Sequence, residues 1–105
     1  MNSRQVCRLG YRDVRAKVGD VVFCCHIYDR SAAQPHLDTV PAATREAAMN
    51  LVCDELMLHK VQFSDEQLAD ALDAWHRDES HYEFDEDGVS LAFFQITIET
   101  NTDSV

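Results

Sequence analysis

The chain has 105 residues, of which 46% are hydrophobic, with only 3 Gly and 2 Pro. This composition predicts one globular domain over residues 1–105 and excludes a disordered or collagen-like chain. The formal net charge of −10 argues against direct binding to nucleic acid or to an anionic membrane, because both require a positively charged surface.

The first part of the chain is expected to form two strands. Residues 5–15 alternate between apolar and polar side chains, which favours a strand over the helix that the spacing of the arginines would also allow. A turn over residues 16–19 follows, in which Gly19 supplies the permissive backbone. Residues 20–28 are rich in β-branched and aromatic side chains and indicate an interior strand. Residues 29–39 are expected to form a loop.

A first helix is expected over residues 40–60. Thr39 is a suitable N-cap, and Pro41 would lie in the first turn, where its missing N–H costs nothing. Apolar residues recur every three or four positions along this segment, namely Ala48, Met49, Leu51, Val52, Leu56 and Leu58. The helix should therefore be well buried.

A second helix has the clearest local signal in the sequence. Ser64 and Gln67 are three residues apart and predict a capping box, while Phe63 and Leu68 flank this box as a hydrophobic staple. The helix should end near Arg77. A strand in this segment would contradict the whole predicted architecture.

The C-terminal part is expected to form a hairpin. Residues 81–86 and 89–99 flank an Asp-Gly dipeptide, which is the strongest short-range signal for a two-residue turn. Such a turn pairs Phe84 with Leu91. The apolar side chains change face after Phe93, which requires either a β-bulge or burial of both faces of the strand.

Taken in order, the elements predict an α+β fold. A single domain would contain an antiparallel sheet of about four strands, in the order β-β-α-α-β-β, with two helices packed on one face of the sheet.

Acidic side chains are concentrated between residues 64 and 87. Within this range the only basic residue besides histidine is Arg77. The carboxylates are Asp65, Glu66, Asp70, Asp73, Asp78, Glu79, Glu83, Asp85, Glu86 and Asp87. They lie on the second helix and the following hairpin, so they should share one side of the molecule. Two interpretations stay open, a solvated face that keeps the protein soluble and a docking surface for a basic partner.

Cysteine and histidine side chains raise the question of a metal or thiol site. In a strand, Cys24 and His26 share a face while Cys25 points the other way, and no second ligand pair follows at metal-binding spacing. We therefore expect no metal and no cofactor, with Cys7, Cys24, Cys25 and Cys53 as reduced thiols. A small thiol or metal enzyme that uses Cys24 and His26 is an alternative.

These observations favour a small acidic protein without enzymatic activity that binds a basic, nucleic-acid-binding protein. In size and charge the chain is similar to the small acidic proteins that phages and mobile elements use against host defence or regulatory machinery. In the same respects it is similar to the immunity proteins that neutralise nuclease toxins. No membrane span and no secretory signal are expected, which predicts the cytoplasm, or the host cytoplasm for a phage protein.

A structural subunit that forms a homodimer through a hydrophobic strand edge is a further alternative. The first thirty residues carry an excess of basic side chains, including Arg4, Arg8 and Arg12. In one copy these arginines could dock on Glu83 and Asp85 of another. This docking is a second way to form a homodimer with no foreign partner.

Overall fold

The computed structural model describes residues 5–9, 12–84 and 88–98. For the first two strands the description covers the backbone alone. The elements in chain order are β1 (Gln5–Leu9), β2 (Arg12–Ala16), β3 (Val21–Asp29), β4 (His36–Ala42), α1 (Arg45–Leu58), α2 (Asp65–His76), β5 (His81–Glu83) and β6 (Val89–Thr97).

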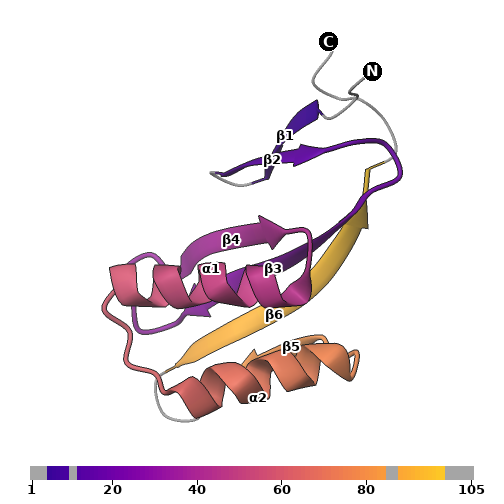
Figure 1. Ribbon diagram of the computed structural model, residues 1–105. Helices are drawn as coiled ribbons and strands as arrows, with labels where there is room; N and C mark the ends of the chain where they lie inside the picture. The colour runs from indigo at the N-terminus through magenta and orange to yellow at the C-terminus, as the bar shows by residue number, and fades with distance from the viewer. Residues whose placement is uncertain (1–4, 10–11, 85–87, 99–105) are drawn as a thin grey trace.

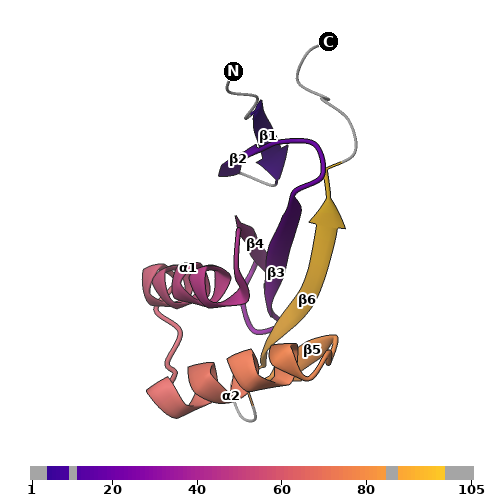
Figure 2. The same ribbon diagram turned by 45° about the vertical axis from the view of Figure 1, so that its right-hand side comes forward.

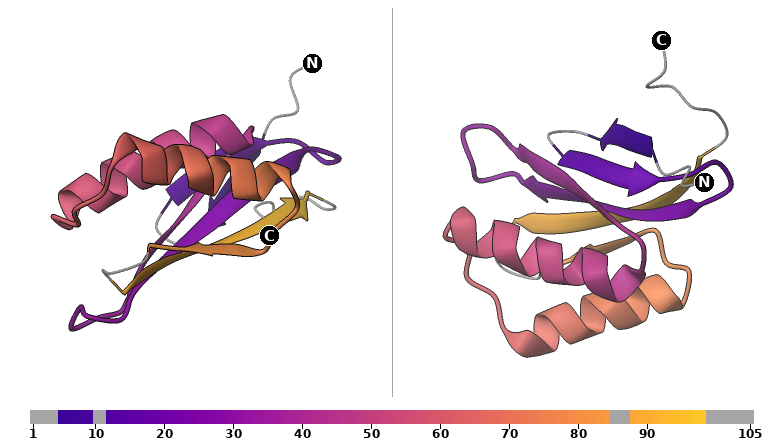
Figure 3. Two further views of the ribbon diagram at one scale, coloured as in Figure 1. Left: turned by 90° about the horizontal axis from the view of Figure 1, so that it is seen from below. Right: turned by 45° about the horizontal axis from the view of Figure 1, so that its top comes forward.

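Four of the strands form an antiparallel sheet in the order β4-β3-β6-β5, while β1 pairs with β2 in a separate hairpin (Figure 1). Both helices lie on the same side of this sheet (Figures 2 and 3). Helix α1 contacts β3 and β4, α2 contacts β5, and the two helices contact each other. The sheet and its helices follow the order β-β-α-α-β-β along the chain, which confirms the predicted α+β fold.

The inner face of the sheet, which faces the helices, carries the main hydrophobic core. Ile27 of β3 and Leu91 of β6 are fully buried there, together with Val52 of α1. The ring of Trp75 from α2 stacks on Phe93 with 4.6 Å between the ring centroids. Each large apolar side chain buried in this way contributes about 1.5–3 kcal/mol to the free energy of unfolding.

The outer face of the sheet is divided into two halves of different chemistry. In one half Val22, Cys24 and Ile98 form a second buried apolar cluster, and the neighbouring Pro41 is also buried. The hairpin of β1 and β2 contacts β4 beside this half (Figure 1). The other half, which we call the open half, is polar and partly or fully exposed. Its members are His26, Tyr28, His36, Thr39, His81, Glu83 and Ser90.

Strand β6 keeps a regular register with β3 along its whole length. No β-bulge therefore accounts for the change of apolar face after Phe93. Instead both faces of the sheet bury apolar residues, with Phe93 in the main core and Ile98 in the outer cluster. This was the second of the two predicted explanations.

Two predicted segments in the first half of the chain are wrong in detail. Residues 5–9 and 12–16 form the paired strands β1 and β2 in place of one strand over residues 5–15. Residues 36–42 form β4 in place of the end of a loop and the start of a helix, so Thr39 and Pro41 are strand residues. The N-cap of α1 is Thr44, whose side chain accepts a hydrogen bond from the Ala47 amide at 3.1 Å.

The predicted register of the C-terminal hairpin is also wrong, by two residues. Tyr82 pairs with Leu91, and the Phe84 amide donates to the Val89 carbonyl at 2.9 Å. Phe84 is therefore opposite Val89 and not Leu91, so four residues, 85–88, connect the strands in place of a two-residue turn. Residues 85–87 lie outside the described part of the chain.

Within the described residues, no helix combines the length and the apolar character that crossing a membrane requires.

The predicted turn before β3 is confirmed, since Gly19 has a φ of 96°, a backbone conformation that other residues rarely adopt. Its amide donates to the Ile98 carbonyl at 2.7 Å, which ties this turn to the end of β6.

Candidate protein-binding surface

The predicted acidic residues lie on α2, on the turn that follows it and on β5. Asp65, Glu66, Asp70 and Asp73 belong to α2, Asp78 and Glu79 to the turn, and Glu83 to β5, and all of them are exposed. We call these seven residues the acidic surface. Asp85, Glu86 and Asp87 lie outside the described residues. Because α2 contacts β5, the acidic surface occupies one edge of the molecule, where α2 and β5 lie side by side (Figure 1).

The local sequence of α2 turns its carboxylates toward solvent. The predicted capping box is confirmed, because Ser64 Oγ accepts from the Gln67 amide at 3.1 Å and Gln67 Oε1 accepts from the Ser64 amide at 2.8 Å. Ala71 and Trp75 are buried against the sheet and fix which face of the helix points inward. Asp73 therefore falls on the solvent side. Acidic residues in the first turn also interact favourably with the helix dipole.

The turn after α2 exposes two more carboxylates. Asp78 has a φ of 63°, the left-handed conformation that ends many helices, and its amide donates to the Trp75 carbonyl at 2.9 Å. Arg77 Nε donates to Glu79 Oε2 at 2.8 Å. In the described part of the chain this is the one ion pair within the acidic surface. His76 turns away from the surface and bonds Glu46 of α1 at 2.9 Å.

Cys24 and His26 both lie on the outer face of β3, as predicted, but their surroundings differ. Cys24 is fully buried in the apolar half, and burial raises its pKa to about 11. A thiol with this pKa stays protonated at neutral pH, which makes it a poor nucleophile and a poor metal ligand. Cys25 points into the main core. Among the described residues, no three His, Cys, Asp or Glu side chains gather as a metal site would require.

His26 instead belongs to a hydrogen-bonded chain across β3 and β4. Its Nδ1 lies 2.8 Å from Thr39 Oγ1, and its Nε2 lies 2.9 Å from Nδ1 of His36. The ring of Tyr28 packs edge-on against His36, with 5.0 Å between the ring centroids. Burial lowers the pKa of His26, the charge of His36 lowers it further, and Asp38 acts in the opposite direction.

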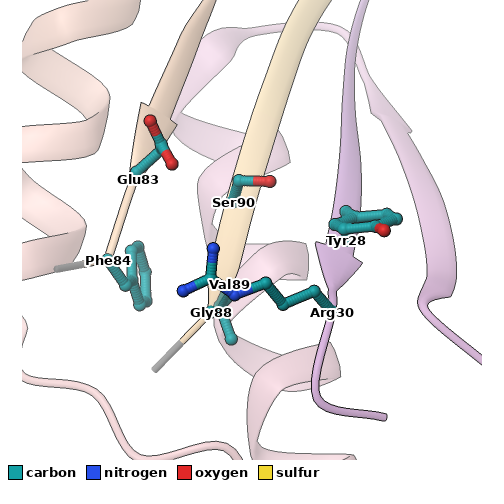
Figure 4. A pocket seen from close by; sticks show the side chains of 7 residues that line it. All are labelled: Tyr28, Arg30, Glu83, Phe84, Gly88, Val89 and Ser90. Carbon is teal, nitrogen blue, oxygen red and sulfur yellow. The ribbon is translucent and has the colours of Figure 1, made fainter. Parts of the chain in front are cut away.

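A cavity of about 240 Å³ opens beside Tyr28, the residue whose ring packs against His36 (Figure 4). It is lined by Tyr28, Arg30, Glu83, Phe84, Gly88, Val89 and Ser90. The Arg30 amide donates to the Gly88 carbonyl at 3.0 Å, and a Cβ at position 88 would lie 3.0 Å from Arg30 Cγ. Because Gly88 has no Cβ, the side chain of Arg30 can pack closely against the backbone at this position. Arg30 and Glu83 place opposite charges around the cavity.

A second cavity, of about 200 Å³, lies where the chain passes from α2 to β5. Its lining combines aromatic and charged side chains, namely Arg45, Trp75, Asp78, Glu79, Ser80, Phe93, Phe94 and Gln95. The Arg45 guanidinium carbon lies 4.6 Å from the centroid of the Phe23 ring. Arg45 Nε is shielded from solvent and has no hydrogen-bond partner among the described residues. Two residues of the acidic surface thus border an aromatic hollow.

Sequence reasoning did not single out Arg30, His36 or Arg45. His36 reaches His26 only through the pairing of β4 with β3, and the segment that forms β4 has the composition of a loop. Residues 36–42 lack a regular apolar alternation, because Asp38 occupies an inward position of the strand, so no clear local signal indicates β4. Comparisons with protein-family models, curated proteins and solved structures found no match.

Proposed function

We propose that this protein is a non-enzymatic binding module that presents the acidic surface to a basic partner, a protein that itself binds nucleic acid. The observation that carries the proposal is the exposure of all seven carboxylates on adjacent elements, with Arg77 giving one ion pair among the described residues. Carboxylates displayed in this way can take the place of phosphates on a basic protein. The module would then act in the cytoplasm as an inhibitor or neutraliser.

The charge of the acidic surface should speed association with the partner more than it strengthens the bound complex. A single exposed ion pair contributes only about 0–1 kcal/mol. Several like charges on one side act together over about 8 Å at physiological salt. A net charge of −10 therefore steers a basic partner toward this edge and repels nucleic acid itself. A nuclease toxin would be recognised by the same chemistry.

The first test is competition. The tagged protein is used to isolate its partner from an extract of the cells that encode it, and the isolated partner is bound to labelled nucleic acid. We expect added protein to displace the nucleic acid. We expect the double variant Asp70→Asn and Asp73→Asn to displace it less effectively, with at least about a threefold higher half-maximal concentration, because each lost pair is weak.

The matched control changes the net charge equally at another site. Ala47 and Asn50 are exposed on α1, and their replacement by lysine also makes the net charge two units more positive. This control should displace nucleic acid nearly as well as the unmodified protein. Equal losses in the two double variants would mean that net charge alone matters. An unchanged Asp70→Asn and Asp73→Asn variant would refute the role of the acidic surface.

A further inference from the structure

The edge of the sheet beside the second cavity is only partly covered. Strand β6 has nine residues, but the three residues of β5 pair only with its residues 90–92. The chain leaves this edge at Ser80, whose carbonyl accepts from the Phe93 amide at 2.9 Å. Within the described residues, no strand pairs with β6 beyond this point on this side. Figure 1 shows β6 extending past the end of β5.

Hydrogen bonds at both ends of β6 show which backbone groups face this edge. The Val89 carbonyl and the Phe93 amide bond toward β5, whereas the Ile98 amide bonds toward β3 at the Asp20 carbonyl. Backbone groups of successive residues in an antiparallel strand point to opposite sides. The amides and carbonyls of Gln95 and Thr97 therefore face the uncovered edge. Both side chains are also exposed.

The side chains around this edge indicate what would bind there. Gln95 lines the second cavity together with the rings of Trp75 and Phe93. Asp78 and Glu79 of the acidic surface line the same cavity. An extended segment placed along β6 would bond to the backbone groups that face this edge and form a strand ladder. One apolar side chain would enter the hollow and its basic neighbours would reach the two carboxylates.

We propose that the edge of β6 at Gln95 and Thr97 binds an extended, basic segment of the partner as an added strand in line with β5. This inference rests on the proposed function, since it names the way in which the basic partner is held. A second copy of the chain is a poorer occupant. Each copy carries a net charge of −10, and two molecules of the same high charge repel each other.

The test uses a defined probe, a blocked peptide of eight residues in which lysine and valine alternate. Hydrogen exchange and amide chemical shifts of the labelled protein are followed by NMR up to about 1 mM peptide, a concentration that detects weak binding. We expect the amides of Gln95 and Thr97 to become protected. The amides of Phe94 and Ile96 already bond to β3 and should change little.

Two variants and a modified peptide separate the strand ladder from simple charge attraction. Gln95→Pro removes an amide that faces the open edge, and proline is tolerated at such positions. Gln95→Thr keeps that amide and is the matched control. Both variants lose the glutamine side chain, so their comparison isolates the amide. We expect Gln95→Pro to bind the peptide about tenfold more weakly than Gln95→Thr, as the loss of a buried hydrogen bond does. A peptide methylated on alternate backbone nitrogens should bind the unmodified protein about tenfold more weakly, which keeps the test independent of variant folding.

Four outcomes would overturn the proposal. The first is amide shifts confined to α2, and the second is equal binding by Gln95→Pro and Gln95→Thr. The third is a concentration-dependent dimer that uses this edge, and the fourth is protection of the Gln95 and Thr97 amides in the protein without peptide. The failures of the two proposals are distinguishable. If Asp70→Asn and Asp73→Asn weaken competition while Gln95→Pro leaves it unchanged, the acidic surface binds the partner and the edge does not.

Discussion

The hydrogen bond between His26 and His36 makes the open half of the sheet sensitive to protonation. One ring nitrogen must donate and the other must accept, so the pair cannot keep this bond when both rings are fully protonated. Burial lowers the pKa of His26, and the charge of His36 adds to this effect, while Asp38 opposes it. Thr39 and Tyr28, which complete the surroundings, carry no charge at neutral pH.

The direction of the pH effect follows from this lowered pKa. An unfolded histidine titrates near 6.5, so between that value and the lower folded value the unfolded chain binds more protons. The free energy of unfolding should therefore be fully retained above about pH 6.5 and should fall as the pH decreases below it. In His26→Gln we expect a smaller decrease of the urea midpoint between about pH 7.5 and about pH 5.5 than in the unmodified protein.

His81→Gln is the control for this measurement, because His81 is exposed on β5 and takes no part in the bond between the two histidines. It should keep the pH dependence of the unmodified protein. Identical slopes in His26→Gln and the unmodified protein would show that the pair has no effect on stability.

The thiols should differ in reactivity according to their burial. Cys24 and Cys25 are fully buried, whereas Cys53 on α1 is partly exposed. Burial raises the pKa of all three thiols. In a Cys7→Ser background we expect an aromatic disulfide reagent to modify Cys53 first, and the other two only after unfolding. Rapid modification of Cys24 in the folded protein would contradict its burial in the outer cluster. It would favour the alternative of a thiol enzyme.

At the level of single elements, α2 is the part of the fold that its own sequence determines most completely. The capping box needs only residues three apart, so it is visible without any knowledge of the sheet. We expect Ser64→Ala to lower the free energy of unfolding by about 1 kcal/mol, the usual effect of a lost N-cap. Chemical denaturation measures this difference. Ser64→Thr keeps the capping oxygen and should stay close to the unmodified protein, and equal losses in both variants would show that packing, not capping, is affected.

Strand β4 shows where local reasoning fails. Its inward positions are Asp38, Val40 and Ala42, and the buried carboxylate of Asp38 conceals the alternation that normally marks a strand. Asp38 Oδ1 accepts from the Thr39 amide at 2.8 Å, which reduces the cost of burying it. Thr39 and Thr44 are equally suitable N-caps by residue type. Only the pairing of β4 with β3 decides between them.

The loop between β5 and β6 shows the same limit. An Asp-Gly dipeptide predicts a two-residue turn, but the observed register leaves four residues in the connection. Gly88 still has a positive φ of 74°, as the turn signal requires. Its partner is Arg30 from the end of β3, a contact between residues distant in the sequence. Both cavities depend on such contacts, so neither could be predicted.

For the whole molecule, the fold class followed from the order of the elements, because strands at both ends with helices between them leave few arrangements. The position of the acidic surface could be predicted from the sequence only in part. Its residues were predicted to share one side, and the seven described ones lie on adjacent elements. Glu83, however, projects from the outer face of the sheet beside Arg30 (Figure 4), so the acidic surface continues around the edge formed by β5.

Concentrated like charge should cost the isolated protein some stability. Replacing Asp70 and Asp73 by lysine removes repulsion on the exposed side of α2 and adds attraction to the remaining carboxylates. We therefore expect a higher urea midpoint for this double variant at low salt, with a gain that shrinks as salt approaches ~0.15 M. A lower midpoint at all salt concentrations would show that these aspartates stabilise the fold.

The most direct test of the account is the rate at which the protein associates with its isolated partner at increasing salt concentrations. It compares the unmodified protein with two double reversals, Asp70→Lys with Asp73→Lys, and Glu83→Lys with Asp85→Lys. We predict that both reversals associate about tenfold more slowly at low salt and that the difference shrinks through ~0.15 M, because electrostatic steering is screened. Unchanged rates and affinities for both reversals at low salt would show that the acidic surface is only a solvated face of the protein.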